Sequence, residues 1–202
     1  MRHAVASILA VAFATLSAHA EGYGPGLTVL LDFREAASPE SLGEMQREVR
    51  HLLAPAGVKV HLKLKSELQP DETFDDLVIV RFQGSCSAPQ DPMLIDERGP
   101  GPLALSHTMG GEIQPFSEVA CDSVRRAVES ALWGDQRKNR EELFGRALGR
   151  VVAHELVHIV GRTARHGKSG VFKTSLSGSQ LIADRMSLDG DDALRIRKSL
   201  TR

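Results

Sequence analysis

The sequence predicts an α+β fold: a mixed β-sheet with packed helices, a central helix and a small C-terminal lobe. Short apolar or alternating segments, which are typical of strands, fall almost entirely before residue 121. Helical patterns dominate the remainder of the chain. The segment 140–160 is apolar on most faces, as expected of a helix inside a protein rather than on its surface. A chain of 202 residues, 42% of them hydrophobic, is long enough for one such domain.

The first twenty residues have the features of an export signal. Residues 1–3 (MRH) give a positive start, residues 4–16 are mostly apolar, and residues 18–20 (AHA) have the small-x-small form of a cleavage site. The apolar run is shorter than the ~20 residues that a membrane-spanning helix needs. We therefore expect cleavage after Ala20, a mature domain of residues 21–202 with no membrane span, and a secreted or periplasmic protein.

The balance of charge excludes one class of partner. The chain has 25 Lys and Arg residues against 26 Asp and Glu residues, which gives a formal net charge of −1. Proteins that bind nucleic acids rely on an excess of positive charge to contact phosphates. We therefore expect no nucleic-acid partner.

Five segments before residue 121 are predicted to be strands. Leu27–Phe33 and Asp76–Phe82 are short apolar runs typical of buried strands, whereas Val58–Leu64 alternates and has one solvated face. Leu103–His107 is a short candidate, and Ile113–Ala120 contains a proline that places it at an edge or a bulge. The Gly-, Pro- and Ser-rich segment between the third and fourth strands is expected to be a long loop.

Shorter helices are expected on both sides of the long one. Ser38 can cap a helix over residues 39–53, which begins with a proline, a residue well suited to the first turn. Residues 123–133 form another helical pattern. Two further helices are predicted to begin near Gln180 and Asp191.

The long helix predicted over residues 140–160 carries one polar row. Asn139 and Glu142 resemble a capping box at its start, and Gly161 is expected to end it in a left-handed cap. Its main polar residues recur every four positions and so lie in one inclined row. They are Arg146, Arg150, His154 and His158. We expect the two arginines to form the solvated end of the row.

The two histidines of this row belong to an HExxH motif. His154 and His158 are one helical turn apart, so both imidazoles can bind one metal ion. Zinc suits neutral imidazole ligands in a tetrahedral arrangement. Glu155 lies one step around the helix, where its carboxylate can reach a water held by the metal and act as general base. The motif predicts a Zn²⁺ site with two histidine ligands and Glu155 as the catalytic residue.

With Gly161 the motif extends to HExxHxxG, and the chain then resembles the metzincin clan of zinc peptidases, whose pattern is HExxHxxGxxH. The resemblance implies a third histidine ligand after the glycine. The pattern places it at position 164, which is Ala164 in this chain, and the next histidine is His166. We expect His166 to be the third ligand, at the end of a loop that is two residues wider. Asp184 and then His107 are the alternatives.

The resemblance also covers the order of elements over residues 27–160. It implies an upper lobe of residues 21–161, a lower lobe of residues 162–202 and a cleft between them. The strand Leu103–His107 would be the edge strand along which a peptide or protein substrate binds. Met186 is the available position for the methionine that lies beneath the zinc in this clan, but its surroundings favour a core or loop methionine.

Cys86 and Cys121 are the only cysteines of the chain. In an oxidising compartment, two cysteines of one domain usually pair. Neither belongs to a CxxC sequence of the kind that binds zinc. We therefore expect a disulfide between Cys86 and Cys121.

Two functions are consistent with these residues. The first is an exported zinc metalloendopeptidase in which Glu155 activates water for attack on a peptide bond. The second is a non-catalytic zinc-binding or peptide-binding module on a degenerate peptidase fold, which the missing histidine at position 164 favours. A purely structural zinc site does not need Glu155, so this carboxylate favours the enzyme.

Overall fold

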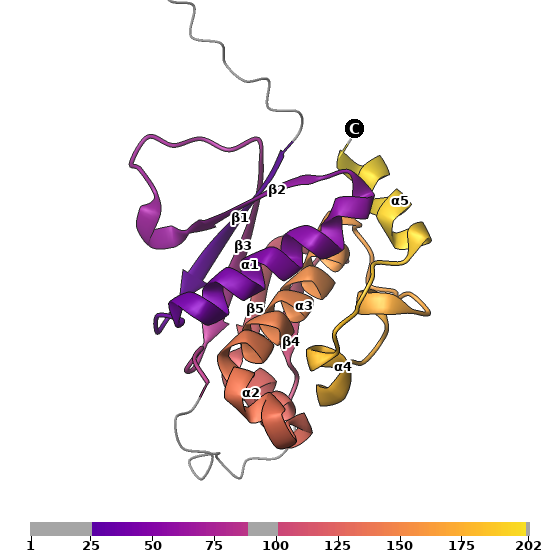
Figure 1. Cartoon of the computed structure of the whole chain (residues 1–202). Coiled ribbons are helices and arrows are strands. Elements are labelled where there is room, and N and C mark those ends of the chain that lie inside the picture. Colours follow the sequence, from indigo (N-terminus) through magenta and orange to yellow (C-terminus); the bar gives the residue numbers. More distant parts are fainter. Residues whose placement is uncertain (1–25, 89–100, 201–202) are drawn as a thin grey trace, which may run out of the picture.

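The computed structural model describes residues 26–88 and 101–200 (Figure 1). The predicted signal peptide, residues 1–20, lies outside these ranges, as does most of the loop predicted between the third and fourth strands. Strands and helices follow in the order β1, α1, β2, β3, β4, β5, α2, α3, α4 and α5, with short 3₁₀ turns between some of them. Apart from α1, the α-helices therefore follow the last strand, as the sequence predicts.

The strands form one mixed sheet in the order β2-β1-β3-β5-β4. The pairs β1–β2, β1–β3 and β3–β5 are parallel, and β4 runs antiparallel to β5. The strands are Gly26–Phe33 (β1), Lys59–Leu64 (β2), Asp76–Gln83 (β3), Ala104–Met109 (β4) and Glu112–Ala120 (β5). All five predicted strands are present, each within a few residues of its expected limits.

Within this sheet β4 is an edge strand, whereas β5 lies between β3 and β4. The proline of β5 is tolerated there because the ladders are irregular beside it. The register of β4 against β5 shifts between Ser106 and Thr108, and the pairing of β5 with β3 begins only at Phe116. Pro115 therefore lies at a bulge of an inner strand, and the alternative that it marks an edge strand is wrong.

The helices are Pro39–Leu53 (α1), Cys121–Ala131 (α2), Arg140–Val160 (α3), Gly178–Ile182 (α4) and Gly190–Leu200 (α5). The first and third, α1 and α3, lie side by side across one face of the sheet (Figure 1). The side chain of Ser38 caps α1 by accepting a hydrogen bond from the amide of Ser41 at 3.1 Å, as predicted. The capping box predicted for α3 is wrong. A 3₁₀ turn, Gly134–Asn139, runs directly into that helix, and Asn139 has φ −108° and ψ 27° instead of an extended conformation.

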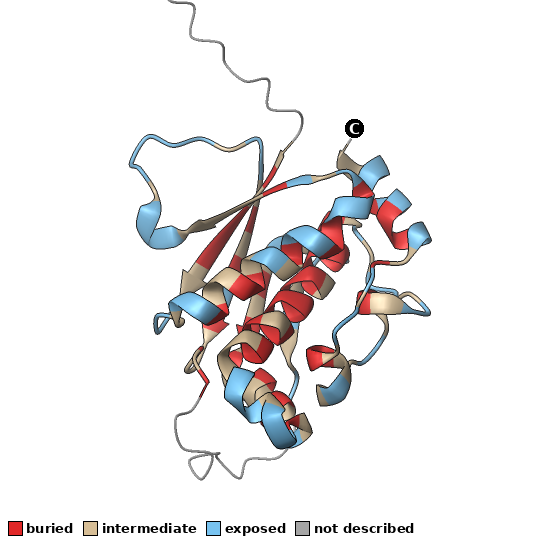
Figure 2. Cartoon of the chain, viewed as in Figure 1, coloured by how far each residue is buried: buried red, intermediate tan, exposed pale blue. Residues whose placement is uncertain are grey.

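Buried apolar residues of the helices and the strands form one core cluster. Figure 2 colours the buried residues red. Alternate residues of the strands face this core, and Val29, Val80 and Phe82 are fully buried. The helix α3 is buried around most of its circumference because α1, β5 and α4 all pack against it. Within residues 26–88 and 101–200, no helix is both long and apolar enough to cross a membrane. The central position predicted for α3 is confirmed.

Two glycines of α3 allow it to approach α1 closely. A Cβ atom on Gly145 would lie 2.4 Å from the backbone oxygen of Ser41, and one on Gly149 would lie 2.8 Å from the backbone oxygen of Met45. Both distances are shorter than any real contact of a Cβ atom. Glycine is therefore required here for the packing of two helix backbones, not for an unusual backbone conformation.

Replacing Gly145 with Ala is expected to lower the free energy of unfolding by about 1–3 kcal/mol, because the added methyl group overlaps a backbone oxygen. Gly43→Ala is the matched control. This glycine also lies in a helix, but its Cβ would meet nothing within 4 Å, so alanine should raise the free energy of unfolding by up to about 1 kcal/mol. Urea denaturation of the metal-free proteins measures both effects. Similar changes from the two substitutions would contradict the close approach.

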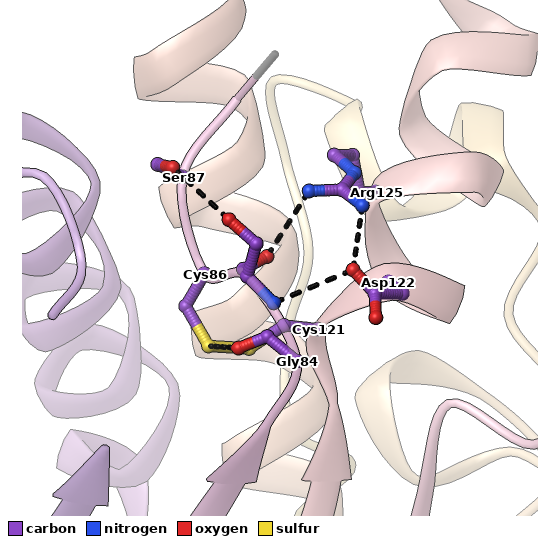
Figure 3. The surroundings of a disulfide bond; sticks show 7 residues. Gly84, Cys86, Ser87, Cys121, Asp122 and Arg125 are labelled. Atoms are coloured by element: carbon purple, nitrogen blue, oxygen red, sulfur yellow. Dashed lines mark hydrogen bonds and ion pairs between the residues drawn. A yellow bond between two sulfur atoms is a disulfide. The ribbon is translucent and has the colours of Figure 1, made fainter. Parts of the chain in front are cut away.

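The two cysteines form the predicted disulfide (Figure 3). Cys86 follows β3 and Cys121 begins α2, and their Cα atoms are 5.1 Å apart. Beside the disulfide, Arg125 donates a hydrogen bond to the backbone oxygen of Ser85 at 3.3 Å, and the Ser85 amide donates to a carboxylate oxygen of Asp122 at 3.4 Å. Covalent and polar links thus attach the segment after β3 to α2. In the chain-entropy description, a cross-link over this span stabilises the fold by roughly 3–4 kcal/mol.

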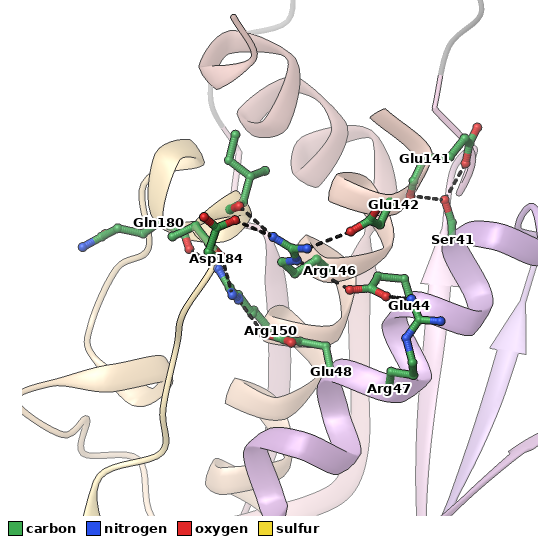
Figure 4. A network of polar contacts seen from close by, with 12 residues as sticks. Ser41, Glu44, Arg47, Glu48, Glu141, Glu142, Arg146, Arg150, Gln180 and Asp184 are labelled. Carbon is green, nitrogen blue, oxygen red and sulfur yellow. Dashed lines mark hydrogen bonds and ion pairs between the residues drawn. The ribbon is translucent and has the colours of Figure 1, made fainter. Parts of the chain in front are cut away.

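The two arginines of the polar row lie in a network of carboxylates and carbonyl groups (Figure 4). Only 1% of Arg150 is exposed, so the prediction of a solvated end is wrong. Its guanidinium donates to the backbone oxygens of Gln180 and Ala183, each at 2.6 Å, and to Glu48 of α1 at 2.7 Å. These bonds compensate for the loss of water around the charge. Arg150 thereby attaches the segment around α4 to α3 and α1.

Candidate metal centre and catalytic cleft

Three histidines come together at the C-terminal half of α3. His154 and His158 lie one turn apart on the helix, and His166 returns to them from the following loop. One ring nitrogen from each lies within 4.8 Å of the other two, and the Nε2 atoms of His158 and His166 are 3.2 Å apart. Among the residues that the structure describes, this is the one group of at least three His, Cys, Asp or Glu side chains close enough to hold a metal ion.

Backbone carbonyl groups orient two of the imidazoles. The Nδ1 atom of His154 lies 3.0 Å from the oxygen of Val171, and the Nδ1 atom of His158 lies 2.6 Å from the oxygen of Thr163. A carbonyl oxygen can only accept, so each Nδ1 atom carries the proton and donates it. In a neutral ring with this tautomer, Nε2 is unprotonated and available to a metal ion, as in most histidines that bind metals.

The geometry and protonation of these histidines fit zinc. Two imidazole nitrogens at ~2.0–2.1 Å from a tetrahedral zinc ion are about 3.3 Å apart, which is close to the separation between His158 and His166. Burial lowers the pKa of His154 to about 4 and also lowers the pKa of His166, which favours the neutral rings that a metal ion requires. Three protein ligands are also the number typical of a catalytic zinc site.

The turn after α3 differs from the prediction at its glycine. Gly161 has φ −75°, so it is not a left-handed cap, and the left-handed residue is Arg162 with φ 46°. Glycine is needed instead because a Cβ atom there would lie 2.5 Å from the oxygen of Val157. The Thr163 amide then donates to the oxygen of His158 at 3.1 Å, which reverses the chain beside His158 and leads it toward His166.

The carboxylate of Glu155 is held from the side of the sheet. Its Oε2 atom accepts hydrogen bonds from the hydroxyl groups of Ser106 on β4, at 2.6 Å, and of Ser117 on β5, at 3.4 Å. Only 6% of Glu155 is exposed. This burial raises the pKa of the Glu155 carboxyl group above its usual value, and the hydrogen bond from Ser106 opposes the increase. The two serines thus fix the orientation of the carboxylate.

A cleft with a volume of about 470 Å³ contains these groups. The three histidines and Glu155 line it together with residues of the edge strand β4. The remaining lining is mainly apolar or carries hydroxyl groups. Its larger apolar residues are Leu103, Leu105, Ile113, Val151 and Leu176. The three imidazoles, the carboxylate and residues of the edge strand therefore share one space.

The structure places the other two candidates for the third ligand away from the histidine group. The side chain of Asp184 is fully exposed and lies 3.5 Å from Arg146 (Figure 4). His107 lies on β4, where its ring contacts Phe116 and its Nε2 atom is 3.6 Å from a carboxylate oxygen of Glu118. The structure thus brings His166, rather than either alternative, to the other two imidazoles.

Phe172 is a residue of the site that the sequence analysis missed. Its ring centroid lies 5.2, 4.6 and 5.5 Å from those of His154, His158 and His166, respectively. Met186 is half-buried and packs against the core, as its surroundings in the sequence favour. An aromatic ring therefore adjoins all three histidines. The only signal for it was the apolar pair Val171-Phe172 in a segment rich in Gly and Ser.

Comparison with known proteins gives a match in structure alone. No protein-family model matches the sequence, and no curated protein matches it. Among solved structures, the archaemetzincin of Methanopyrus kandleri superposes with a TM-score of 0.52 at 15% sequence identity. The match covers 89% of this chain and 98% of the other. The two proteins share a fold.

The archaemetzincin fold confirms the predicted metzincin-like α+β class, with a five-stranded mixed sheet and packed helices. The fold is therefore similar to that of a zinc metallopeptidase. On this archaemetzincin-like framework, α3 carries His154, Glu155 and His158, and the loop that follows it carries the third histidine.

Proposed function

We propose that this chain is an exported zinc-dependent metallopeptidase that hydrolyses peptide bonds. One observation carries the proposal: a group of three imidazoles that fits zinc opens into the same cleft as a buried carboxylate, Glu155. A site that only stabilises a fold is usually closed by four protein ligands and needs no such carboxylate. The fold shared with archaemetzincin supports the same assignment.

Each residue of the cleft has a separate part in the proposed reaction. His154, His158 and His166 would hold zinc, which would supply Lewis-acid chemistry by lowering the pKa of a water and polarising the carbonyl group of the substrate. Glu155 accepts a proton from the attacking water and delivers it to the amine that leaves. The hydroxyl group of Ser106 holds Oε2 of Glu155, so the carboxylate is oriented before the substrate arrives.

The substrate in this proposal is an extended peptide or an unstructured segment of a protein. β4 pairs with β5 along one side, and it is the last strand of the sheet. Its outer edge can therefore form main-chain hydrogen bonds with an added strand. Leu105, on this strand, is 56% exposed and lines the cleft beside the catalytic groups. A peptide along β4 would pass directly in front of Glu155.

The location in this proposal rests on two independent features. Residues 1–20 have the pattern of a cleaved signal peptide, which supports an exported mature chain in the periplasm or outside the cell. The disulfide between Cys86 and Cys121 agrees with an oxidising compartment.

A peptide library tests the proposal directly. The mature chain, residues 21–202, is incubated with the library and the new termini are identified by mass spectrometry. We expect cleavage that a zinc chelator abolishes and added zinc restores. A protein that binds zinc but cleaves no member of a broad library would instead be a non-catalytic binding module.

Removing the hydroxyl group that orients Glu155 should reduce turnover. Ser106→Ala is expected to lower kcat about tenfold, because a hydrogen bond to a charged group contributes about 1.5 kcal/mol or more. KM and zinc content should change little. Ser106→Thr keeps the hydroxyl group and should retain most of the activity. An alanine variant with the kcat of the wild type would show that Ser106 does not support the base.

A further inference from the structure

A single buried ring borders all three histidines. Phe172 is 0% exposed, and its ring centroid lies between 4.6 and 5.5 Å from each imidazole centroid. It meets His158 nearly edge to face, with an interplanar angle of 71°, and is tilted by 39–54° to the other two. Rings at these distances and angles are in van der Waals contact, in arrangements that aromatic rings favour. One side chain thus packs against the whole group.

The backbone of the same short turn also forms hydrogen bonds with His154 and with the residue that follows His166. The turn is Gly170–Phe172, a single 3₁₀ turn. The oxygen of Val171 accepts the hydrogen bond from His154, and the oxygen of Phe172 accepts one from the amide of Gly167 at 3.0 Å. Gly167 directly follows the third histidine. Consecutive residues of one turn therefore fix one ligand ring and the backbone next to another.

The turn is itself fixed from the opposite side. The amide of Val171 donates to the oxygen of Ser187 at 2.9 Å. Gly170 has φ 66°, and a Cβ atom on it would lie 2.3 Å from that same oxygen. Only glycine allows both the left-handed conformation and this close approach. The position of Phe172 is thus determined by backbone contacts that do not involve the histidines.

The ring has a physical role that a smaller side chain could not fill. An imidazole can rotate about its two side-chain torsions, and a cavity behind it would allow orientations in which Nε2 no longer faces the other ligands. Two of the imidazoles have one hydrogen bond each to a carbonyl oxygen, which limits but does not prevent this rotation. A buried ring against all three fills the space on that side, so no cavity is left behind the imidazoles and water is kept from that side of the site.

We infer that Phe172 is a positioning residue of the metal centre, which holds His154, His158 and His166 in the arrangement that binds zinc. The inference rests on the proposed function insofar as that function requires zinc at these histidines. It adds a residue outside the HExxH motif on which the affinity and geometry of the site depend. The role belongs to the packing of the ring, so it is separable from any contact with substrate.

The test measures metal binding rather than catalysis. Zinc affinity of the mature wild type, Phe172→Leu and Phe172→Ala is determined by competition with a chromophoric chelator, and the absorption spectrum of the Co²⁺-substituted proteins reports ligand geometry. We expect Phe172→Ala to weaken zinc binding about 10- to 100-fold, the usual range for the loss of a residue that supports metal ligands. The Co²⁺ absorption bands should also change. Phe172→Leu keeps more of the buried volume, so its zinc affinity should lie between those of the wild type and Phe172→Ala.

Phe82→Ala is the matched control. Phe82 is also a phenylalanine with 0% exposure, but it lies on β3 and stacks on Phe33 with centroids 4.0 Å apart. Its loss should lower the melting temperature of the metal-free protein and leave zinc affinity and the Co²⁺ spectrum unchanged. A drop in affinity as large as that of Phe172→Ala would mean that general loosening of the core explains the effect, which would overturn the inference.

The remaining outcomes separate the inference from the proposed function. If the wild type binds zinc, and both variants of Phe172 bind it as tightly with an unchanged Co²⁺ spectrum, the inference is wrong while the proposed function stands. If the wild type itself fails to bind zinc, the proposed function fails, and the inference fails with it. Should Phe172→Ala not fold, the Phe172→Leu variant decides, because weaker binding is expected there too.

Discussion

Glu155→Gln is expected to abolish most peptide cleavage while the protein still binds one zinc ion per chain. The substitution keeps the size of the side chain but removes the group that accepts a proton. General base catalysis typically contributes about 10²- to 10⁴-fold, so we expect kcat to fall by about that factor. Zinc affinity should change little, because the ligands in this account are the three histidines. Steady-state kinetics and metal analysis of the same preparation measure the two quantities.

Glu129→Gln is a suitable control for this substitution. Glu129 is also a buried glutamate, with 7% exposure, but it lies on α2 and pairs with Arg140 at 4.0 Å. It should affect stability and leave kcat near that of the wild type. If Glu155→Gln retained turnover within a few-fold of the wild type, Glu155 would not be the general base. If the Glu155→Gln variant lost zinc as well as activity, Glu155 would be part of the metal centre.

His166→Ala is expected to weaken zinc binding by at least about 100-fold, the upper end of the range for residues that only support ligands. Its Nε2 atom lies 3.2 Å from that of His158, so its loss removes a ligand and leaves two. Asp184→Ala is the matched comparison, because this carboxylate is the alternative ligand in the sequence and yet is fully exposed beside Arg146. The Asp184→Ala variant should bind zinc with the affinity of the wild type. Competition with a chromophoric chelator measures both affinities.

The opposite pattern would locate the third ligand elsewhere. Normal affinity in His166→Ala together with a loss in Asp184→Ala would require the segment around α4 to rearrange when zinc binds. That segment is held by Arg150, through hydrogen bonds to the oxygens of Gln180 and Ala183. Such a result would therefore contradict the arrangement of the C-terminal part of the chain as well as the assignment of the ligand.

Most features set by local sequence were predictable, and the capping box at Asn139 is an exception. The cap at Ser38, the strands and the long helix depend on residues close together in the chain, and all are present. The pairing of His154 with His158 follows from the pitch of a helix. The disulfide was predictable for another reason, since a chain with two cysteines allows only one intramolecular pair.

Features that depend on distant partners were not predictable. Arg150 has the spacing of a solvated residue, but its partners come from α1 and from residues 180–183, so its burial becomes evident only in the assembled fold. Phe172 is separated from His154 by a loop whose path no pattern in the sequence indicates. The error at Gly161 has a more local origin. Glycine is needed there because a Cβ atom would lie too close to the oxygen of Val157, not because the backbone is left-handed.

The third ligand shows where spacing reaches its limit. The metzincin pattern places a histidine at position 164, and the chain has Ala164 there. Whether two additional residues could be accommodated depends on how the loop turns. Arg162 takes a left-handed conformation, and Thr163 bonds to the backbone and to the ring of His158, which brings His166 to the group. No count of residues could have specified that path.

The zinc content of the purified mature chain tests the central claim most directly. Bound metal is removed with a chelator, and the protein is dialysed against micromolar ZnCl₂ and then freed of excess metal. Its zinc content is measured by inductively coupled plasma mass spectrometry. Three imidazoles positioned for tetrahedral coordination predict one zinc ion per chain, lost in His154→Ala and in His158→Ala. A folded chain that remains free of metal after this treatment would contradict the account.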